Sequence, residues 1–323
     1  NNRIRLEGDF YDSQSIDLLL NVPVPTITGY STQMQNIGKV QNRGMEFTLN
    51  TKNLTGEFAW SSNFNISFNK NKVLEVGVDG RPIYGSAANA NNAFITKPGY
   101  PIASFYGYKY IGVFQSEEEL AKYPHLSGDK VGDGRYEDVN KDGVLDQNDK
   151  TILGDNNPLF TAGFSNSFSY KNFTLDIQFT GSYGAEVFSF YKRMCGIYHG
   201  DRNGMIEQLG RWQSKDQPGD GIHFRPTRTP SGWQRDPSSA WVQDASYLRL
   251  RNLTLGYNFD QKVLDKMKMK GLRLYVTGQN LFTITNYVGY DPETSSESGL
   301  AQGGDYLGYP AARSFIIGAN ITF

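Results

Sequence analysis

Residues 138–149 read DVNKDGVLDQND, a pattern with which short loops bind calcium. Calcium takes about six to eight oxygen ligands, and a twelve-residue loop supplies them from alternate positions around an obligatory glycine at position six. Gly143 takes that turn position, and Leu145 is expected to point inward as an anchor. The predicted ligands are Asp138, Asn140, Asp142, the backbone carbonyl of Val144, Asp146 and Asp149.

This loop departs from the EF-hand pattern at its last position, where Asp149 stands in place of glutamate. The shorter side chain reaches an ion less easily with both oxygens, so we expect a modest affinity. No helical pattern flanks the loop, and Ca2+ would therefore have a structural role, neutralising carboxylates in a long loop. The alternative is an acidic turn without metal, because Asp and Asn side chains also stabilise turns by bonding to the backbone.

Other residues that could carry chemistry are scattered. The three histidines, His125, His199 and His223, follow no zinc-binding spacing, and the lone Cys195 gives no disulfide framework. The sequence contains neither the GxSxG motif of hydrolases nor a phosphate-binding glycine loop. We therefore do not expect an enzyme.

The composition combines many aromatic rings with a polar background. The 323 residues are 14% aromatic, yet the mean hydropathy is −0.52 and the net charge is −1. A nearly neutral chain has no basic field for nucleic acid. No apolar run approaches the roughly 18 residues of a membrane helix, whereas membrane-crossing strands alternate and have a low average hydropathy.

Strict alternation of apolar and polar residues recurs along the chain. In residues 173–180, for example, Phe173, Leu175, Ile177 and Phe179 share one face, and Thr, Asp and Gln share the other. The same pattern occurs in residues 57–69, 253–259 and 315–323. It predicts antiparallel strands with one apolar face and one wet face.

Short turns and long loops connect these segments. Short turns at one end and long loops at the other are the layout of outer-membrane barrels. Residues 205–213 and 261–270 are expected to form short helices. A strand near 89–97, followed by a short turn at 97–101 on the inner side, brings the count to about ten strands. The other short turns lie near 51–56, 170–172 and 260–271, and the long loops span about 116–159, 186–240 and 285–311.

Several blocks of sequence resemble one family in the same order along the chain. They are DLLLNVPVP (17–25), NIGKVQNRGMEFTLN (36–50), YPIASFYGYKYIGVFQS (100–116), residues 138–184, YLRLRNLTLGYNF (247–259), LRLYVTGQNLFTITNYVGYDPE (272–293) and FIIGANITF (315–323). Together they closely resemble the C-terminal barrel half of SusC/RagA-type TonB-dependent transporters of the Bacteroidetes outer membrane. The resemblance implies an all-β transmembrane barrel of about 22 strands. Residues 1–323 would form about the last ten strands, without the plug domain.

The resemblance also implies a function and partners. The function would be TonB-dependent active import of glycans or peptides across the bacterial outer membrane. The partners would be TonB with its inner-membrane energising complex, a SusD-like surface lipoprotein, membrane lipid and the barrel-assembly machinery. That machinery would read the terminal strand, which ends in an aromatic residue and carries Phe315, Ile317, Ile321 and Phe323 on one face.

Aromatic residues in the long loops are candidates for substrate binding. Rings can stack on sugars or hold peptides, and they can equally pack the loops together. The candidates are Trp212, Trp233, Trp241 and Tyr198.

Two other functions fit the same pattern. A passive, porin-like outer-membrane channel would have the same two-faced strands without a plug. A soluble calcium-binding β-sandwich adhesin would bury its apolar faces against one another.

Overall fold

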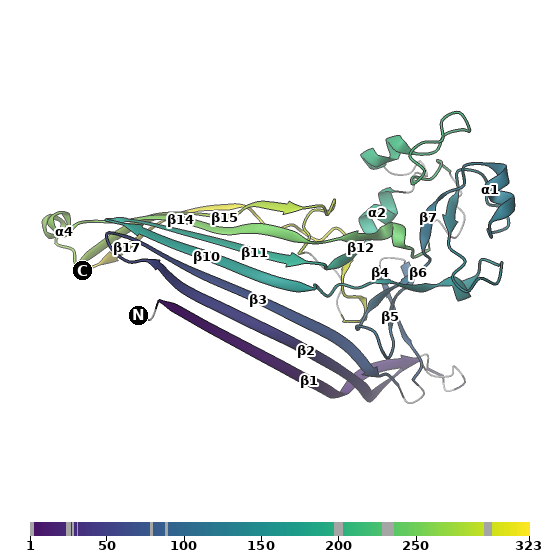
Figure 1. The fold of residues 1–323 in the computed structure, drawn as a ribbon, viewed down its shortest axis with the longest axis horizontal. Coiled ribbons are helices and arrows are strands. Elements are labelled where there is room, and N and C mark those ends of the chain that lie inside the picture. Colours follow the sequence, from purple (N-terminus) through teal and green to yellow (C-terminus); the bar gives the residue numbers. More distant parts are fainter. Residues whose placement is uncertain are drawn as a thin grey trace.

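The chain forms one long twisted sheet that leads into a cluster of smaller sheets (Figure 1). The structure is a computed structural model that describes residues 3–23, 27, 29–30, 32–77, 80–87, 90–196, 203–227, 236–293 and 299–323. We call the long sheet the wall and the smaller sheets, with the segments around them, the loop cluster. The two ends of the chain lie at the end of the wall remote from the loop cluster.

The wall contains eight described strands, all antiparallel to their neighbours, and β1 and β17 are its edges. In spatial order the strands are β1 (Ile4–Pro23), β2 (Thr32–Leu54), β3 (Phe58–Glu75), β10 (Phe160–Tyr170), β11 (Phe173–Tyr183), β14 (Tyr247–Asn258), β15 (Gly271–Thr285) and β17 (Ser314–Thr322). The alternating segments recognised in the sequence all lie in this sheet. The prediction of two-faced antiparallel strands is thereby confirmed.

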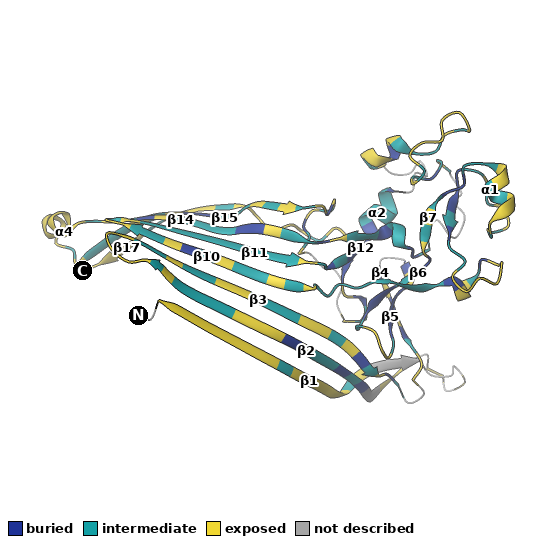
Figure 2. Ribbon diagram, in the orientation of Figure 1, coloured by how far each residue is buried: buried dark blue, intermediate teal, exposed yellow. Residues whose placement is uncertain are grey.

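One face of the wall is apolar across its width. Pairing places Phe64 beside Phe164 and Phe164 beside Phe179, and the row continues through Leu250 to Phe282. Leu250 is buried, but the rings of the row are exposed: Phe64 by 37%, Phe164 by 41% and Phe282 by 43%. Exposed stretches also run along the strands in Figure 2. No second sheet of the described residues covers this face, as a soluble sandwich would require.

The opposite face of the wall carries amides and hydroxyls. One row across six strands consists of Asn50, Asn63, Ser165, Gln178, Asn252 and Gln279. The side chains bond to one another within it: the Asn63 amide nitrogen donates to the Asn50 oxygen over 2.7 Å, and Asn252 donates to Gln178 over 2.9 Å. We call this row the amide row.

Short turns close one end of the wall, as predicted. β10 and β11 are joined by residues 171–172, and the Asn172 side chain donates to Asp260 over 2.7 Å at the start of α4 (Gln261–Met267). The helix predicted near 261–270 is therefore present. It ends at Lys268, which adopts the left-handed conformation with φ 55°.

The long connections lie at the other end and form the loop cluster (Figure 1). Its sheets contain the strands β4 (Ile83–Ala87), β5 (Ala90–Thr96), β6 (Ser104–Gly107) and β9 (Thr151–Gly154); β7 (Tyr110–Val113) and β8 (Gly134–Tyr136); and β12 (Glu186–Ser189), β13 (Val242–Asp244) and β16 (Gly304–Asp305). Its helices are α1 (Glu117–Lys122), α2 (Phe190–Cys195), η2 (Gln147–Asp149), η3 (Ile206–Gly210), η4 (Ser239–Trp241) and η5 (Gly299–Ala301). The helix predicted at 205–213 is this short 3-10 turn, η3.

The strand predicted near 89–97 exists but does not belong to the wall. It is β5, which pairs with β4 and β6 in the loop cluster, so the described wall has eight strands where about ten were expected. The turn at 97–101 is not an inner turn either: the Val73 amide donates to the Tyr100 carbonyl over 2.8 Å, at the loop end of β3. The whole of 76–159 is thus one connection between neighbouring wall strands.

A core of phenylalanine rings holds the loop cluster together. Phe94, Phe105, Phe188 and Phe190 are fully buried, and the centroids of Phe188 and Phe190 lie 5.2 Å apart. Burial of each such ring contributes about 2 kcal/mol. None of the described helices is long and apolar enough to span a membrane.

A charged substitution should destabilise the protein much more on the apolar face of the wall than on the amide-row face. In the intact protein, Ile177→Lys in the middle of β11 should lower the free energy of unfolding in lipid vesicles by about 2–4 kcal/mol, because it puts a cation in hydrocarbon. The matched control, Gln178→Lys, lies on the amide-row face and should change it by less than about 1 kcal/mol. Equal effects of the two substitutions would contradict the assignment of the faces.

Candidate functional site

The acidic loop 138–149 lies in the loop cluster, between β8 and β9. Its glycine, Gly143, has φ +84°, which a turn at that position requires. Leu145 is buried against Tyr108 and Tyr136, and the prediction that it anchors the loop is confirmed. The loop is therefore anchored by its one buried apolar side chain, whereas Val139 and Val144 are exposed.

The side chains of this loop bond to its own backbone. The two Asp138 oxygens accept from the amides of Lys141, over 2.7 Å, and Gly143, over 2.9 Å. Asp142 accepts from the Val144 amide over 2.9 Å, and Asp146 caps η2 by accepting from Asn148 over 2.7 Å. These are the local turns that Asp side chains form.

Asp149 is the most enclosed member of the loop and is 0% exposed. One of its oxygens accepts from the Val139 amide over 2.9 Å, and the other accepts from the Asp146 amide over 2.8 Å. Its carboxylate thus joins the two halves of the loop. A shorter residue than glutamate suits this place, because the backbone amides already lie within its reach.

The donor set of the loop fits a hard cation. It offers carboxylate, amide and carbonyl oxygens and no nitrogen or sulfur, which is what Ca2+ prefers. Among the described residues, however, no three His, Cys, Asp or Glu side chains lie together as a metal ion requires. Binding would require the side chains of Asp138 and Asp142 to turn away from their backbone partners toward the ion.

The aromatic candidates for substrate binding are placed differently from one another. Trp241 belongs to η4, is 2% exposed and packs against Phe224, with ring centroids 6.0 Å apart. Trp212 is half-buried beside Gly132, where its ring leaves no space for a side chain. Trp233 and Tyr198 lie outside the described residues. The structure thus gives Trp241 a packing role, and substrate binding by these four residues stays a prediction.

The terminal strand carries its large residues outward. Phe315, Ile317 and Ile321 are exposed on the apolar face of β17, and Phe323 follows the strand. β17 pairs with β15, where Gly318 lies under the ring of Tyr275. Recognition of these residues by an assembly machinery stays a prediction.

A buried ionic network at the loop end of the wall was not found by sequence analysis. Arg249 of β14 is 3% exposed and donates to Asp291 over 2.5 Å, to Thr283 over 2.8 Å and to Glu293. Arg251 also donates to Glu293, over 2.6 Å. The network fastens the connection between β15 and β17 to the wall.

Asp291 is the centre of this network on the loop side. Burial alone would raise the pKa of its carboxyl, but the bond from Arg249 and those from the backbone amides of Ala311 and Glu293 outweigh burial and lower it. Its other oxygen accepts from the Ala311 amide over 3.0 Å. A stable negative charge at Asp291 therefore holds both ends of the described loop.

Comparison with known proteins gives consistent relatives over the whole chain, although no family model matches it. The TonB-dependent receptors P3 and P26 of Formosa agariphila are 36% and 34% identical to it. The TonB-dependent receptor SusC of Bacteroides thetaiotaomicron is 29% identical. Each alignment covers 100% of this chain but 32%, 33% and 30% of the relative, so the chain spans about a third of the length of the curated relatives it matches.

Solved structures agree with the fold. The structure of the RagAB peptide transporter superposes with a TM-score of 0.81 at 23% identity, and the RagAB peptide importer in its open-open state with 0.79 at 24%. Each covers 100% of this chain, which corresponds to 34% and 33% of the other. The chain thus has the fold of a segment of these proteins.

The ionic network makes a specific prediction about stability. Arg249→Met should lower the free energy of unfolding of the intact protein by about 3 kcal/mol, because the buried carboxylate of Asp291 loses its ionic partner. The more exposed Arg251→Met should cost less than about 1 kcal/mol. The measurements are denaturant unfolding and proteolysis of the loop at 286–313.

The same network should depend on pH in one direction only. Because the folded-state pKa of Asp291 is lowered, its stabilisation is complete above the unfolded value of about 3.9. It is lost as the pH falls through the lower folded value.

A loop in Arg249→Met as resistant to protease as in the unsubstituted protein would contradict the anchoring role.

Proposed function

We propose that this chain, whose whole length matches TonB-dependent receptors, forms part of the outer-membrane β-barrel of an active importer of glycans or peptides. The observation that carries the proposal is the correspondence of the whole chain to TonB-dependent receptors. The two-faced wall supports it physically. Each inner strand of the wall pairs with a neighbour on both sides, and the side chains separate a lipid-facing from a water-facing surface.

The amide row supports a role in passage of hydrophilic solutes. Its side chains offer both donors and acceptors, and they carry no charge between Asn50 and Gln279. A surface of this kind exchanges hydrogen bonds with water and with sugar hydroxyls or peptide amides at little electrostatic cost. The relatives bear the names SusC and peptide transporter, and both solute classes remain part of the proposal.

Energy for import would come from outside this chain. In the proposal, TonB transmits the proton gradient of the inner membrane to a plug domain formed by another part of the protein. The barrel itself makes and breaks no covalent bond. Its contribution is a rigid water-filled passage.

The loop cluster is the proposed surface for a SusD-like lipoprotein. Large apolar side chains are exposed there, among them Ile206, Leu209 and Tyr290, and Tyr309 is 97% exposed. Apolar side chains grouped at the surface are a common feature of protein interfaces. The Arg249 network would set the position of the loop that carries Tyr290 and Tyr309.

We also propose that the loop 138–149 binds Ca2+ as a structural ion. The oxygen-only donor set and the left-handed Gly143 support this proposal. The ion would replace the bonds that Asp138 and Asp142 now make to the backbone. Its effect would be to stiffen the loop cluster.

Import is tested with the intact transporter in its cell. Uptake of a labelled oligosaccharide or a labelled peptide should fall at least about tenfold when TonB is inactivated, because active transport needs its energy. Deletion of the neighbouring lipoprotein should reduce uptake of the same solute. Uptake that continues unchanged without TonB would support a passive channel instead.

Calcium binding is tested by titration calorimetry on the intact protein. Asp142→Asn should weaken the affinity about tenfold, because it removes one of the charged ligands. Glu137→Gln, just outside the loop, is the matched control and should leave the affinity unchanged. The absence of binding heat at millimolar calcium would show that the loop is an acidic turn only.

A further inference from the structure

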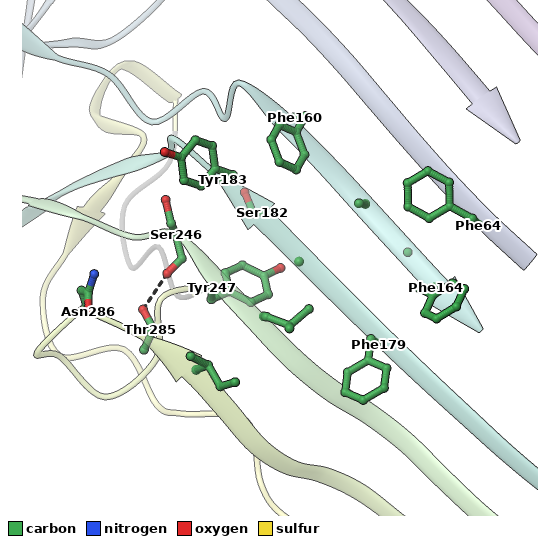
Figure 3. A pocket seen from close by; sticks show the side chains of 15 residues that line it. Phe64, Phe160, Phe164, Phe179, Ser182, Tyr183, Ser246, Tyr247, Thr285 and Asn286 are labelled. Atoms are coloured by element: carbon green, nitrogen blue, oxygen red, sulfur yellow. Dashed lines mark hydrogen bonds between the residues drawn. The ribbon is translucent and has the colours of Figure 1, made fainter. Parts of the chain in front are cut away.

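A hollow of about 470 Å3 lies on the apolar face of the wall, near the loop end of the strands (Figure 3). Its floor is formed where Ala162 of β10 pairs with Gly181 of β11, so no side chain larger than a methyl group stands there. The side of the hollow away from the loops is lined by the rings of Phe64, Phe164 and Phe179.

The hollow follows directly from the register of the strands. Rows of paired residues cross the apolar face, and the row containing Ala162 and Gly181 lies between two rows of aromatic residues. On the loop side, Phe160 and Tyr183 are stacked with centroids 5.5 Å apart. The same row continues through Ile66 on one side and Leu248 on the other, so the small pair leaves a trough that spans β10 and β11 and is part of the regular sheet.

We propose that this hollow holds an acyl chain of a membrane lipid in the outer leaflet. The apolar face is the lipid-facing surface of the barrel, so the hollow is continuous with an interface that lipid already covers. An ordinary convex surface contacts a chain from one side, whereas this trough contacts it from three. Its size is that of small-molecule sites in general.

The polar groups around the hollow lie on one side of it. Figure 3 shows the hydroxyl of Tyr183, together with Ser246 and Asn286, at the loop end, opposite the rings of Phe64 and Phe164. This order matches a lipid whose headgroup lies at the membrane surface and whose chain points toward the middle. Tyrosine is favoured at that level of a membrane.

Neither a further strand of the barrel nor the transported solute can take this place. The hollow is built on β3, β10, β11, β14 and β15, each of which has a strand on both sides in the wall. The amide row faces the other way, so a solute in the passage does not reach the hollow. The site requires only that the wall lies in a membrane and is independent of import.

The proposal is tested by native mass spectrometry of the intact transporter, titrated in detergent with dioleoylphosphatidylglycerol. Ala162→Leu fills the trough and should weaken the tightest-bound lipid about tenfold, the effect of losing about two buried methylene contacts. Ala319→Leu makes the same enlargement at an exposed position of the apolar face and should leave the affinity unchanged. Equal affinities of the two variants would overturn the site.

Two further measurements separate the acyl chain from other occupants. A phosphatidylglycerol with six-carbon chains should fail to displace the tight lipid, while dioleoylphosphatidylethanolamine should displace it; the reverse result would overturn a chain-binding site. A cryo-electron microscopy map of the unsubstituted transporter in dioleoylphosphatidylglycerol nanodiscs should show an ordered chain beside Phe164. A hollow that is empty or filled by protein in that map would also overturn the proposal.

Discussion

The pairing of every strand with its neighbours is the constraint on which the rest of the structure depends. In hydrocarbon an unpaired amide or carbonyl costs several kcal/mol, so the backbone must satisfy itself within the sheet. Pairing then fixes the register, and the register places each side chain on one of two faces. The apolar row that begins at Phe64 and the amide row that contains Asn63 lie on opposite faces because the same strand pairing sets both.

Much of this arrangement could be read from alternation alone. The strand at 173–183 shows a period of two because one face meets an apolar medium and the other meets water. Alternation predicts the wrong sheet for β5 because its residues Ala93, Phe94, Ile95 and Thr96 are all buried. A run that is buried on both faces has no period to reveal which sheet it joins.

The functional side chains were less accessible to sequence reasoning. Arg249 stands at a polar position of an alternating strand, and its partner Asp291 lies far along the chain in a loop. Nothing local distinguishes it from Arg251, which is more exposed. Trp241 illustrates the same limit, because a ring that stacks on a solute and a ring that fills a core have the same sequence signature.

The long connection at 76–159 joins two strands that lie side by side, since Phe64 pairs directly with Phe164. The entropic free energy of closing such a connection is small, because each doubling of its length costs only about 0.6 kcal/mol. The pairing of two neighbouring strands therefore places little restriction on the length of the connection between them. This connection can therefore change in length without altering the register of the wall.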